Sequence, residues 1–344
     1  MSKNILLTDA GGTHIRFACY NGRECSPSVR YKIQEFPTFI EAVNTYLTET
    51  ETTISSMVIG AAGLRCNNRV CLTNHTWVID APKIEKQLNL ERVILLNDFT
   101  LQGLGTLDCQ EADLLHLGKE CPIVSGPRAV IGAGTGLGVC FLMPNGENDF
   151  TVYESEAGHT TLGVVTKSMH IIAQKAWEKV PHLSFERLVS GQGIMLLYQI
   201  IGENYTEWQE TVLFDEIVKM KQAYHFIVST EKSGEWIPVT SGPEITNLAE
   251  QGNEIALMTW WLFFKYLGVF CSNMALTLKT SGGVYLVGDI LTHPTVKQLL
   301  IASRIRPTFE KKGRFKSFME NIPLILVDKK NIPLLGLMHI AKRM

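Results

Sequence analysis

Asp9 is the first residue in the chain whose surroundings suggest chemistry. It ends the apolar run 4–9 and is followed closely by Gly11, Gly12 and Thr13. Glycines let the backbone bend tightly and approach a ligand, and the amides of such a turn can hold a phosphate. The Asp9 carboxylate would then face the Mg²⁺ ion that accompanies nucleotide phosphates, because Mg²⁺ prefers oxygen ligands. A plain hairpin turn is the alternative interpretation.

A second glycine-rich turn, 132–138, follows the apolar residues 129–131 and reads Gly-Ala-Gly-Thr-Gly-Leu-Gly. This alternation suits an anion held by main-chain amides. The spacing lacks the third glycine of the dinucleotide-binding fingerprint, and the chain contains no P-loop motif. We therefore expect an anion-binding turn that is neither a dinucleotide-binding turn nor a P-loop. The alternative is a glycine-rich turn that only packs tightly.

Asp98 follows the apolar run 93–96 within the motif Asn97-Asp98-Phe99-Thr100. An aspartate at the carboxyl end of a strand in an α/β protein lies where ligands generally bind. We predict that Asp98 is a general base that accepts the proton of an attacking hydroxyl. The alternative is that Asp98 is the N-cap of the helix that follows.

Two further motifs carry carboxylates and an imidazole: Glu156-Ala-Gly-His159, and Glu186 in the stretch 185–191. Such groups suit sugar recognition, because neighbouring hydroxyls are best held by bidentate acceptors and planar polar groups. Surface charges and capping residues are the alternative. In the stretch 281–290, glycines that include Gly282, Gly283 and Gly288 flank an apolar strand and could admit an adenine and ribose; a bare strand with glycine ends is the alternative.

Strands that alternate with helices position these motifs and indicate an α/β layer structure. Each glycine-rich turn is followed by an apolar run that ends at an Asn-Gly pair, Asn21-Gly22 or Asn145-Gly146, which is a hairpin signature. The two segments also match Gly12 with Gly136, which indicates an internal duplication. After residue 160 the pattern becomes largely helical, and the stretch 229–250 reads as a surface excursion. The expected elements are helices 39–48, 168–179, 194–201, 211–228 and 255–278, strands 57–62, 93–96, 284–288 and 324–327, and a loop at 67–68.

Composition favours a soluble folded enzyme over a nucleic-acid or membrane protein. The chain has 344 residues, 45% of them hydrophobic and 19% charged, with a formal net charge of -2. The apolar segment 258–278 carries Lys265 and Asn273, so we expect a buried core helix. The cysteines lack metal or redox spacing and the N-terminal apolar run is too short for a signal peptide, so we expect free thiols and a cytoplasmic location.

Taken in order, these motifs resemble the bacterial glucokinase family of the sugar kinase, heat-shock-protein and actin superfamily. The likeness spans nearly the whole chain. The residues that carry it are Asp9-Ala-Gly-Gly-Thr13 with Arg16, Thr73-Asn-His-Thr-Trp77, Asn97-Asp-Phe-Thr100, Gly132-Ala-Gly-Thr-Gly-Leu-Gly138, Glu156-Ala-Gly-His159, Glu186-Arg-Leu-Val-Ser-Gly191, Gly282-Gly283 and Lys312-Gly-Arg-Phe-Lys316.

The resemblance implies an actin-like, ribonuclease H-like α/β fold of two domains with a cleft between them. The small α/β domain would comprise 1–108 plus 328–344, and the larger helix-rich domain 109–327. It also implies ATP-dependent phosphorylation of the 6-hydroxyl of glucose or a related hexose, the first step of glycolysis. Relatives are commonly dimers, so a homodimer is expected.

The resemblance also implies roles for individual residues. Asp9 would hold Mg²⁺ through water, and Gly282 and Gly283 would contact the nucleotide. The residues that would bind sugar are Asn97, Asp98, Glu156, His159 and Glu186, with Asp98 as the base. Those that would bind the phosphates of ATP are Gly11, Gly12, Thr13, Gly134, Thr135 and Gly136.

Three positions depart from the family pattern. They are His14, the stretch Ala61-Ala62-Gly63 that lacks the usual proline, and Asp289 in place of a glycine. The zinc-binding cysteine cluster of the related repressor and kinase family is absent, so no structural metal is expected. Two alternatives stay open: a kinase for another hexose such as glucosamine or mannose, and a sugar-sensing binding protein without turnover.

Overall fold

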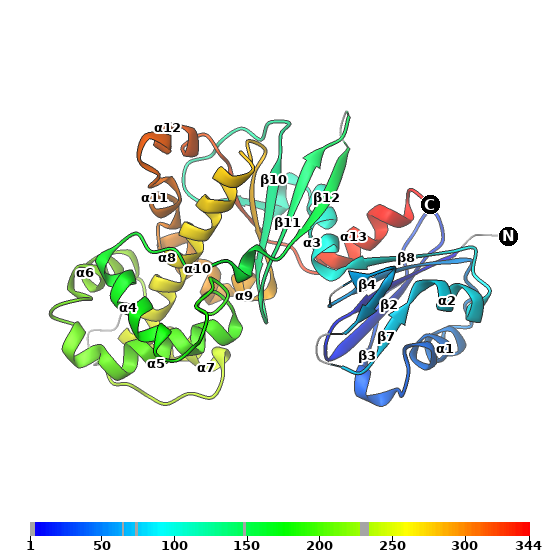
Figure 1. The fold of residues 1–344 in the computed structure, drawn as a ribbon, viewed down its shortest axis with the longest axis horizontal. Helices are drawn as coiled ribbons and strands as arrows, with labels where there is room; N and C mark the ends of the chain where they lie inside the picture. The colour runs from blue at the N-terminus through cyan, green and yellow to red at the C-terminus, as the bar shows by residue number, and fades with distance from the viewer. Residues whose placement is uncertain (1–3, 64, 73–74, 147–148, 228–233) are drawn as a thin grey trace. The chain divides into compact units, whose positions relative to one another are not determined.

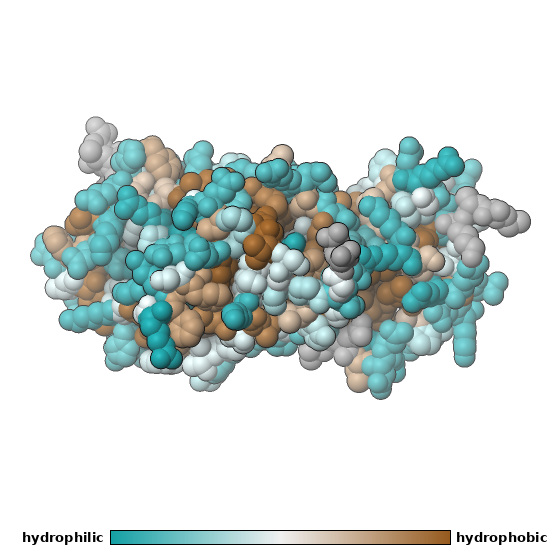
Figure 2. All heavy atoms as spheres, turned by 90° about the horizontal axis from the view of Figure 1, so that it is seen from above, coloured by the Kyte–Doolittle hydropathy of each residue, from teal (hydrophilic) through white to brown (hydrophobic). Residues whose placement is uncertain are grey.

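The computed structural model describes residues 4–63, 65–72, 75–146, 149–227 and 234–344. The chain forms two compact units (Figure 1). Unit 1 comprises Met1–Gln110, Val152–Glu154 and Lys329–Met344, and unit 2 comprises Glu111–Thr151 and Ser155–Asp328. Each unit has a main sheet of its own. Figure 2 shows hydrophilic side chains over much of the face that it presents, with apolar side chains in separate groups between them.

Unit 1 is built on a five-stranded sheet in which a hairpin precedes parallel strands. Its order is β3-β2-β1-β4-β8. Strand β2 runs antiparallel to β1, whereas β1, β4 and β8 are parallel to one another. The bounds are β1 Ile5–Ala10, β2 His14–Tyr20, β3 Val29–Lys32, β4 Ser56–Ala61 and β8 Arg92–Asn97.

Alternate residues of the unit 1 strands face two separate apolar cores. Leu6 and Ile59 belong to one core, and their neighbours Leu7 and Val58 belong to the other. This period of two is what a sheet covered on both faces requires. The first core also takes in residues of α1 (Phe39–Glu49) and α2 (Ala81–Leu88), and the second takes in residues of α3 (Asp98–Leu107) and α13 (Ile332–Ala341).

Helices α3 and α13 cross at a very short distance because each has a glycine at the contact. A Cβ atom at Gly105 would lie 2.2 Å from the Ile332 carbonyl oxygen, and one at Gly336 would lie 2.1 Å from the Leu101 carbonyl oxygen. No side chain fits such a gap unless the backbones move apart. This contact fixes the C-terminal helix against α3, the helix that begins at Asp98.

A small three-stranded sheet, β5-β6-β7, also belongs to unit 1. The turn between its first two strands is Asn67-Asn68, and both residues have positive φ, 49° and 62°. Asparagine tolerates this conformation better than most residues, which makes the pair a tight hairpin turn where a loop was predicted. The bounds are β5 Arg65–Cys66, β6 Arg69–Cys71 and β7 Val78–Asp80. Residues 73 and 74 of the motif 73–77 lie outside the described residues.

Unit 2 repeats the plan of unit 1 in a six-stranded sheet of order β12-β11-β10-β13-β14-β9. The hairpin β10–β11 corresponds to β1–β2, and β13 and β14 continue parallel to β10 as β4 and β8 continue from β1. The internal duplication indicated by the sequence therefore has a counterpart in the topology. The bounds are β9 Leu114–His116, β10 Arg128–Ala133, β11 Leu137–Pro144, β12 Phe150–Ser155, β13 Gly283–Val287 and β14 Leu324–Val327.

The long apolar helix α8 (Glu254–Thr277) is the centre of the helical part of unit 2. It packs against α5, α7 and α11 (Figure 1). It is the one helix among the described residues that is long and apolar enough to cross a membrane, but 94% of its apolar window is buried inside the protein. It is therefore the core helix that the sequence predicted. The other helices are α4 Lys167–Trp177, α5 Gly191–Trp208, α6 Phe214–Ala223, α7 Gly242–Glu250, α9 Asp289–Thr292, α10 Pro294–Ala302, α11 Ile305–Glu310 and α12 Lys316–Met319.

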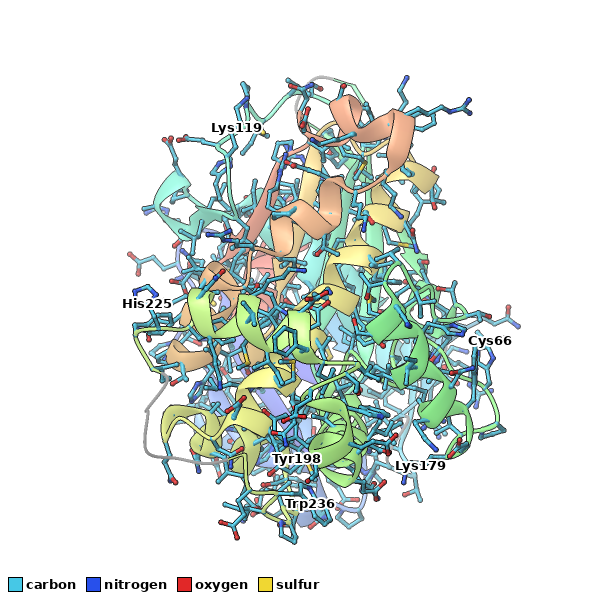
Figure 3. All side chains as sticks on the ribbon, turned by 90° about the vertical axis from the view of Figure 1, so that its left-hand side faces the viewer. Cys66, Lys119, Lys179, Tyr198, His225 and Trp236 are labelled. Carbon is cyan, nitrogen blue, oxygen red and sulfur yellow. The ribbon has the colours of Figure 1, made fainter. Side chains whose placement is uncertain are left out.

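The prediction of a surface excursion over 229–250 is wrong for 242–250, whereas 234–241 is irregular and largely exposed, and 229–233 lie outside the described residues. Residues 242–250 form helix α7, with Ile245 and Ala249 buried. The segment before it covers α5, where Tyr198 donates a hydrogen bond to the Ile237 carbonyl at 2.8 Å. Figure 3 labels Tyr198 and Trp236 near each other on this side of unit 2. The proline after Ser241-Gly242 marks the first turn of a helix and not part of a surface excursion.

Candidate active site

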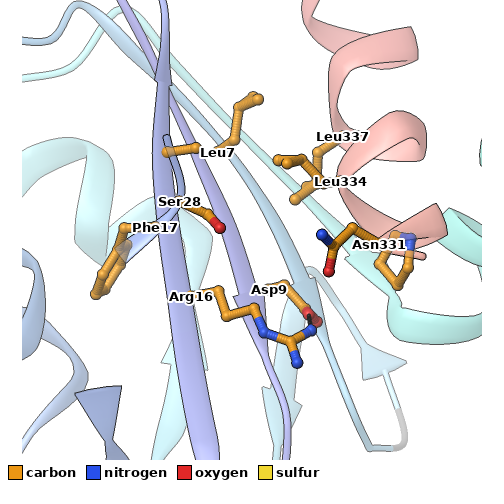
Figure 4. Close-up of a pocket in the computed structure, with 10 residues that line it drawn as sticks. Leu7, Asp9, Arg16, Phe17, Ser28, Asn331, Leu334 and Leu337 are labelled. Atoms are coloured by element: carbon orange, nitrogen blue, oxygen red, sulfur yellow. Dashed lines mark hydrogen bonds and ion pairs between the residues drawn. The ribbon is translucent and has the colours of Figure 1, made fainter. Parts of the chain in front are cut away.

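Asp9 and its glycine turn lie at the carboxyl end of β1 in unit 1. The turn closes through a 3.0 Å hydrogen bond from the Gly11 amide to the His14 carbonyl. Arg16, which faces Asp9 across the β1–β2 ladder, places its guanidinium 3.3 Å from the Asp9 carboxylate (Figure 4). Burial raises the pKa of Asp9 above its usual value, and the Arg16 charge opposes that rise. Arg16 therefore holds the carboxylate at one side of the turn.

The described residues offer no ready-made cage for a metal ion. They contain no cluster of three or more histidine, cysteine, aspartate or glutamate side chains that could hold one. Asp9 is a single carboxylate already paired with Arg16. Such a donor suits an ion that keeps most of its waters and is held mainly by substrate phosphates, as Mg²⁺ usually is in nucleotide sites.

Asn97 and Asp98 lie at the carboxyl end of β8, on the same edge of the sheet as Asp9, because β1, β4 and β8 are parallel. The Asn97 side chain caps α3 by accepting the Phe99 amide at 2.8 Å, so the capping residue is Asn97 and not Asp98. Its own amide reaches the Gly63 carbonyl at 3.4 Å. Asp98 is the first residue of α3, and its carboxylate also accepts the Phe99 amide, at 2.9 Å.

The glycine turn of unit 2 follows β10 and is fastened by Glu186. The Leu137 amide donates to a Glu186 carboxylate oxygen at 2.9 Å, and the Gly191 amide donates to the Gly134 carbonyl at 2.7 Å. A Cβ atom at Gly136 would lie 2.5 Å from the same carboxylate, whereas one at Gly134 would meet nothing within 4 Å. Glu186 thus shapes one side of the turn, and Gly134 and the exposed Thr135 leave the other side open.

His159 lies between the two carboxylates that the sequence singled out with it. Its Nδ1 is 3.6 Å from Glu186 and its Nε2 is 3.8 Å from Glu156. The backbone joins the two motifs, since the Glu186 amide donates to the Gly158 carbonyl at 3.0 Å. The structure therefore brings Glu156, His159 and Glu186 together beside the glycine turn, as one set of groups able to bind hydroxyls.

Gly282 and Gly283, which the sequence predicted to contact the nucleotide, do not lie beside the glycine turn. They precede and begin β13, and Gly283 pairs with Arg128 at the start of β10, so they are at the opposite end of the sheet from the turn. Packing accounts for Gly282, where a Cβ atom would lie 2.4 Å from the Gly126 carbonyl oxygen. The glycine that meets the turn region is Gly288, with φ of 112° and a Cβ position 2.9 Å from the Ala133 carbonyl oxygen.

Several features of the site were not predicted. The bond from Leu137 to Glu186 and the bond from Asn97 to Gly63 join residues far apart in the sequence, so no local pattern reveals them. The placement of Gly288 could have been deduced, because the carboxyl end of a parallel strand is the ligand-binding end. Asp289, one of the departures from the family pattern, is exposed to solvent.

Each unit places a β-hairpin before parallel strands, and glycine turns and carboxylates lie at the strand ends. This arrangement defines the actin-like fold of sugar kinases. Solved structures agree. The chain is similar to glucokinase from an Antarctic psychrotroph, with a TM-score of 0.80 and 24% identity over 100% of both chains. A ROK family glucokinase from Streptomyces griseus in complex with glucose and AMPPNP has a TM-score of 0.59 and 17% identity, with 99% of this chain and 100% of that chain covered.

Sequence comparison assigns the family. The family model described as glucokinase matches residues 6–344. The glucokinase of Campylobacter jejuni subsp. doylei is 31% identical over 331 residues, which cover 94% of this chain and 90% of the relative. A glucokinase of Neisseria meningitidis is 32% identical over 329 residues, with the same coverage. The chain belongs to the glucokinase family.

Proposed function

We propose that this protein is a glucokinase that transfers the γ-phosphoryl group of ATP to the 6-hydroxyl of glucose. The observation that carries the proposal is the set Glu156, His159 and Glu186, whose last member also holds the glycine turn after β10. A carboxylate shared between a hydroxyl-binding set and a phosphate-binding turn ties the position of the sugar to that of the nucleotide. Family membership supports the same assignment.

Five side chains bind the sugar in this proposal. Carboxylates and the imidazole can each accept or exchange hydrogen bonds with neighbouring hydroxyls, and a site made of such groups rejects analogues that lack a hydroxyl. The capping bond fixes Asn97 before any ligand binds, because its oxygen already holds the start of α3. The five side chains are Asn97, Asp98, Glu156, His159 and Glu186.

Asp98 acts as the general base. It takes the proton of the 6-hydroxyl, the sugar oxygen bonds to the γ-phosphorus, and the bond from that phosphorus to the β,γ-bridging oxygen breaks to release ADP. Its place at the N-terminus of α3 stabilises the anionic form of the carboxylate. Because phosphoryl transfer depends mainly on positioning and charge neutralisation, Asp98 needs alignment more than unusual basicity.

The two glycine turns hold the phosphates of MgATP. Gly11, Gly12 and Thr13 provide the turn in unit 1, and Gly134, Thr135 and Gly136 provide the turn in unit 2. Mg²⁺ bound with the nucleotide would neutralise phosphate charge, and Asp9 would hold it through water. We place the product at the start of glycolysis in the cytoplasm and expect the protein to work as a homodimer.

A coupled assay of ADP release tests the proposal. MgATP would be supplied with glucose, mannose, glucosamine, N-acetylglucosamine or fructose in parallel. We expect turnover with glucose that exceeds turnover with every other sugar. Preferred turnover of another hexose would refute the assignment of glucose, and the absence of turnover with all five, while glucose still raises thermal stability, would mark a sugar sensor instead.

A further inference from the structure

Unit 2 contains a cavity that the proposed reaction does not use. It has a volume of about 210 Å³ and lies where β10 begins, β11 ends and β12 begins. Arg128 begins β10, and the glycine turn follows that strand, so the cavity is about 20 Å from the turn at the usual rise of a strand. The cavity is thus separate from the groups assigned to sugar and phosphate.

Arg128 is a permanent cation in this cavity, held in place by two aromatic rings. The centre of its guanidinium is 4.6 Å from the centroid of the Phe150 ring and 5.4 Å from that of Tyr285. Both distances fall within the range of a cation–π contact. The rings fix the plane of the fork without using its N–H groups, because a cation–π contact involves the charge and not the donors.

No described carboxylate neutralises Arg128. Among the residues that the structure describes, it forms no ion pair, and its buried Nε has no hydrogen-bond partner. Asp149 lines the same cavity, and its carboxylate accepts the Phe150 amide at 2.9 Å. A guanidinium stays protonated in proteins, and a buried donor without an acceptor lowers the stability of the fold.

The remaining residues that line the cavity indicate the kind of ligand it could hold. Ile123 and Val124 line it and are 41% and 48% exposed, which is unusual for large apolar side chains. Ser125 adds a hydroxyl beside them. The volume is below the range of about 300–1,000 Å³ typical of sites for drug-sized ligands. The occupant that fits is therefore small, with one anionic end at Arg128 and an apolar part beside Ile123 and Val124.

We propose that this cavity binds a small organic anion whose carboxylate or phosphate group pairs with Arg128. The guanidinium matches either group in a bidentate manner, and Ile123 and Val124 would contact an apolar part of the ligand. This inference does not depend on the catalytic assignment, because none of the residues in it is assigned to sugar or nucleotide.

Calorimetric titration with phenyl phosphate and with benzoate tests the proposal, and benzyl alcohol serves as the neutral comparison. The protein would first be saturated with glucose and a nonhydrolysable ATP analogue, so that the proposed catalytic groups are occupied. We expect saturable binding of at least one anion below about 10 mM and no comparable binding of benzyl alcohol. Absence of binding by both anions, or its loss whenever the nucleotide analogue is present, would overturn the proposal.

Variants of Arg128 separate its charge from its packing. Arg128→Met keeps an apolar stem and should weaken anion binding by at least about tenfold, whereas Arg128→Lys should weaken it less. The matched control is Arg314→Met, because Arg314 also lies over an aromatic ring, 5.4 Å from the Phe315 centroid, but outside the cavity. Equal binding by the folded Arg128→Met variant and the wild type would show that Arg128 is not the anchor.

Discussion

Glu186 has two tasks in this account, and substitutions can separate them. One carboxylate oxygen accepts the Leu137 amide of the glycine turn at 2.9 Å, and the other lies 3.6 Å from the His159 imidazole. Glu186→Ala removes both contacts and leaves the amide of Leu137, a buried residue, without its acceptor. An orphaned buried donor costs about 1–3 kcal/mol. If that cost falls on the phosphate-binding form of the turn, the KM for ATP rises roughly 5- to 150-fold.

Glu186→Gln keeps an oxygen that can accept the Leu137 amide but loses the negative charge. We therefore expect it to raise the KM for glucose far more than the KM for ATP. Glu156→Gln is the matched control, because Glu156 is 70% exposed and contacts His159 but not the turn. It should affect the KM for glucose alone.

Steady-state kinetics of ADP release measure these effects, with ATP varied at saturating glucose and glucose varied at saturating ATP. Glu186→Ala should raise both KM values. If it raised only the KM for glucose and left the KM for ATP within about twofold of the wild type, the carboxylate would not support a phosphate-binding turn.

Three further predictions concern stability. Glu216, buried in unit 2, accepts hydrogen bonds from Lys265, Trp261 and Ser168. Burial alone would raise the pKa of Glu216, but Lys265 and the other donors lower it below its usual value. The stability that ionised Glu216 contributes is therefore complete above about pH 4.5 and is lost as the pH falls through the lowered pKa. In urea denaturation, Glu216→Ala should lower the free energy of unfolding by about 3–5 kcal/mol, and the double variant Glu216→Leu with Lys265→Met should recover most of that stability. An equal loss of stability in both variants would show that the unpaired charge is not the cause. Gly336→Ala should lower the same free energy by about 1–3 kcal/mol, because its Cβ would lie 2.1 Å from the Leu101 carbonyl oxygen. Gly134→Ala has open space around it and should change stability by under about 0.5 kcal/mol while raising the KM for ATP; a large loss of stability would contradict the open side of the turn.

The sequence predicted the parts of the fold that repeat a local pattern. The run 93–96 lies in a half-buried strand that ends at Asn97, and the run 129–131 lies in a buried strand that leads into the glycine turn. Both are parallel strands of their sheets, with Asn97 and the turn at the ligand-binding edge. The pairs Asn21-Gly22 and Asn145-Gly146 indicated the two hairpins. Helix 255–278 was evident because nearly every residue in it is apolar.

The rest depended on information that a single sequence does not contain locally. Whether Gly282 or Gly288 is near the turn depends on the direction of β13 within the sheet, which is set by its pairing with β10. The choice of Asn97 as the cap of α3 depends on the exact first residue of the helix. The bond from Glu186 to Leu137 depends on the packing of two distant segments, and it gives Glu186 a role beyond binding sugar.

Phosphorus NMR of the wild type and of Asp98→Asn tests the central claim most directly. In MgATP and glucose, the wild type should convert the γ-phosphate signal into that of glucose 6-phosphate with an equal amount of ADP. Asp98→Asn should bind glucose but form the product about 10²- to 10⁴-fold more slowly, because general-base catalysis contributes about that much. Release of inorganic phosphate without a sugar phosphate, or an unchanged rate in Asp98→Asn, would contradict the account.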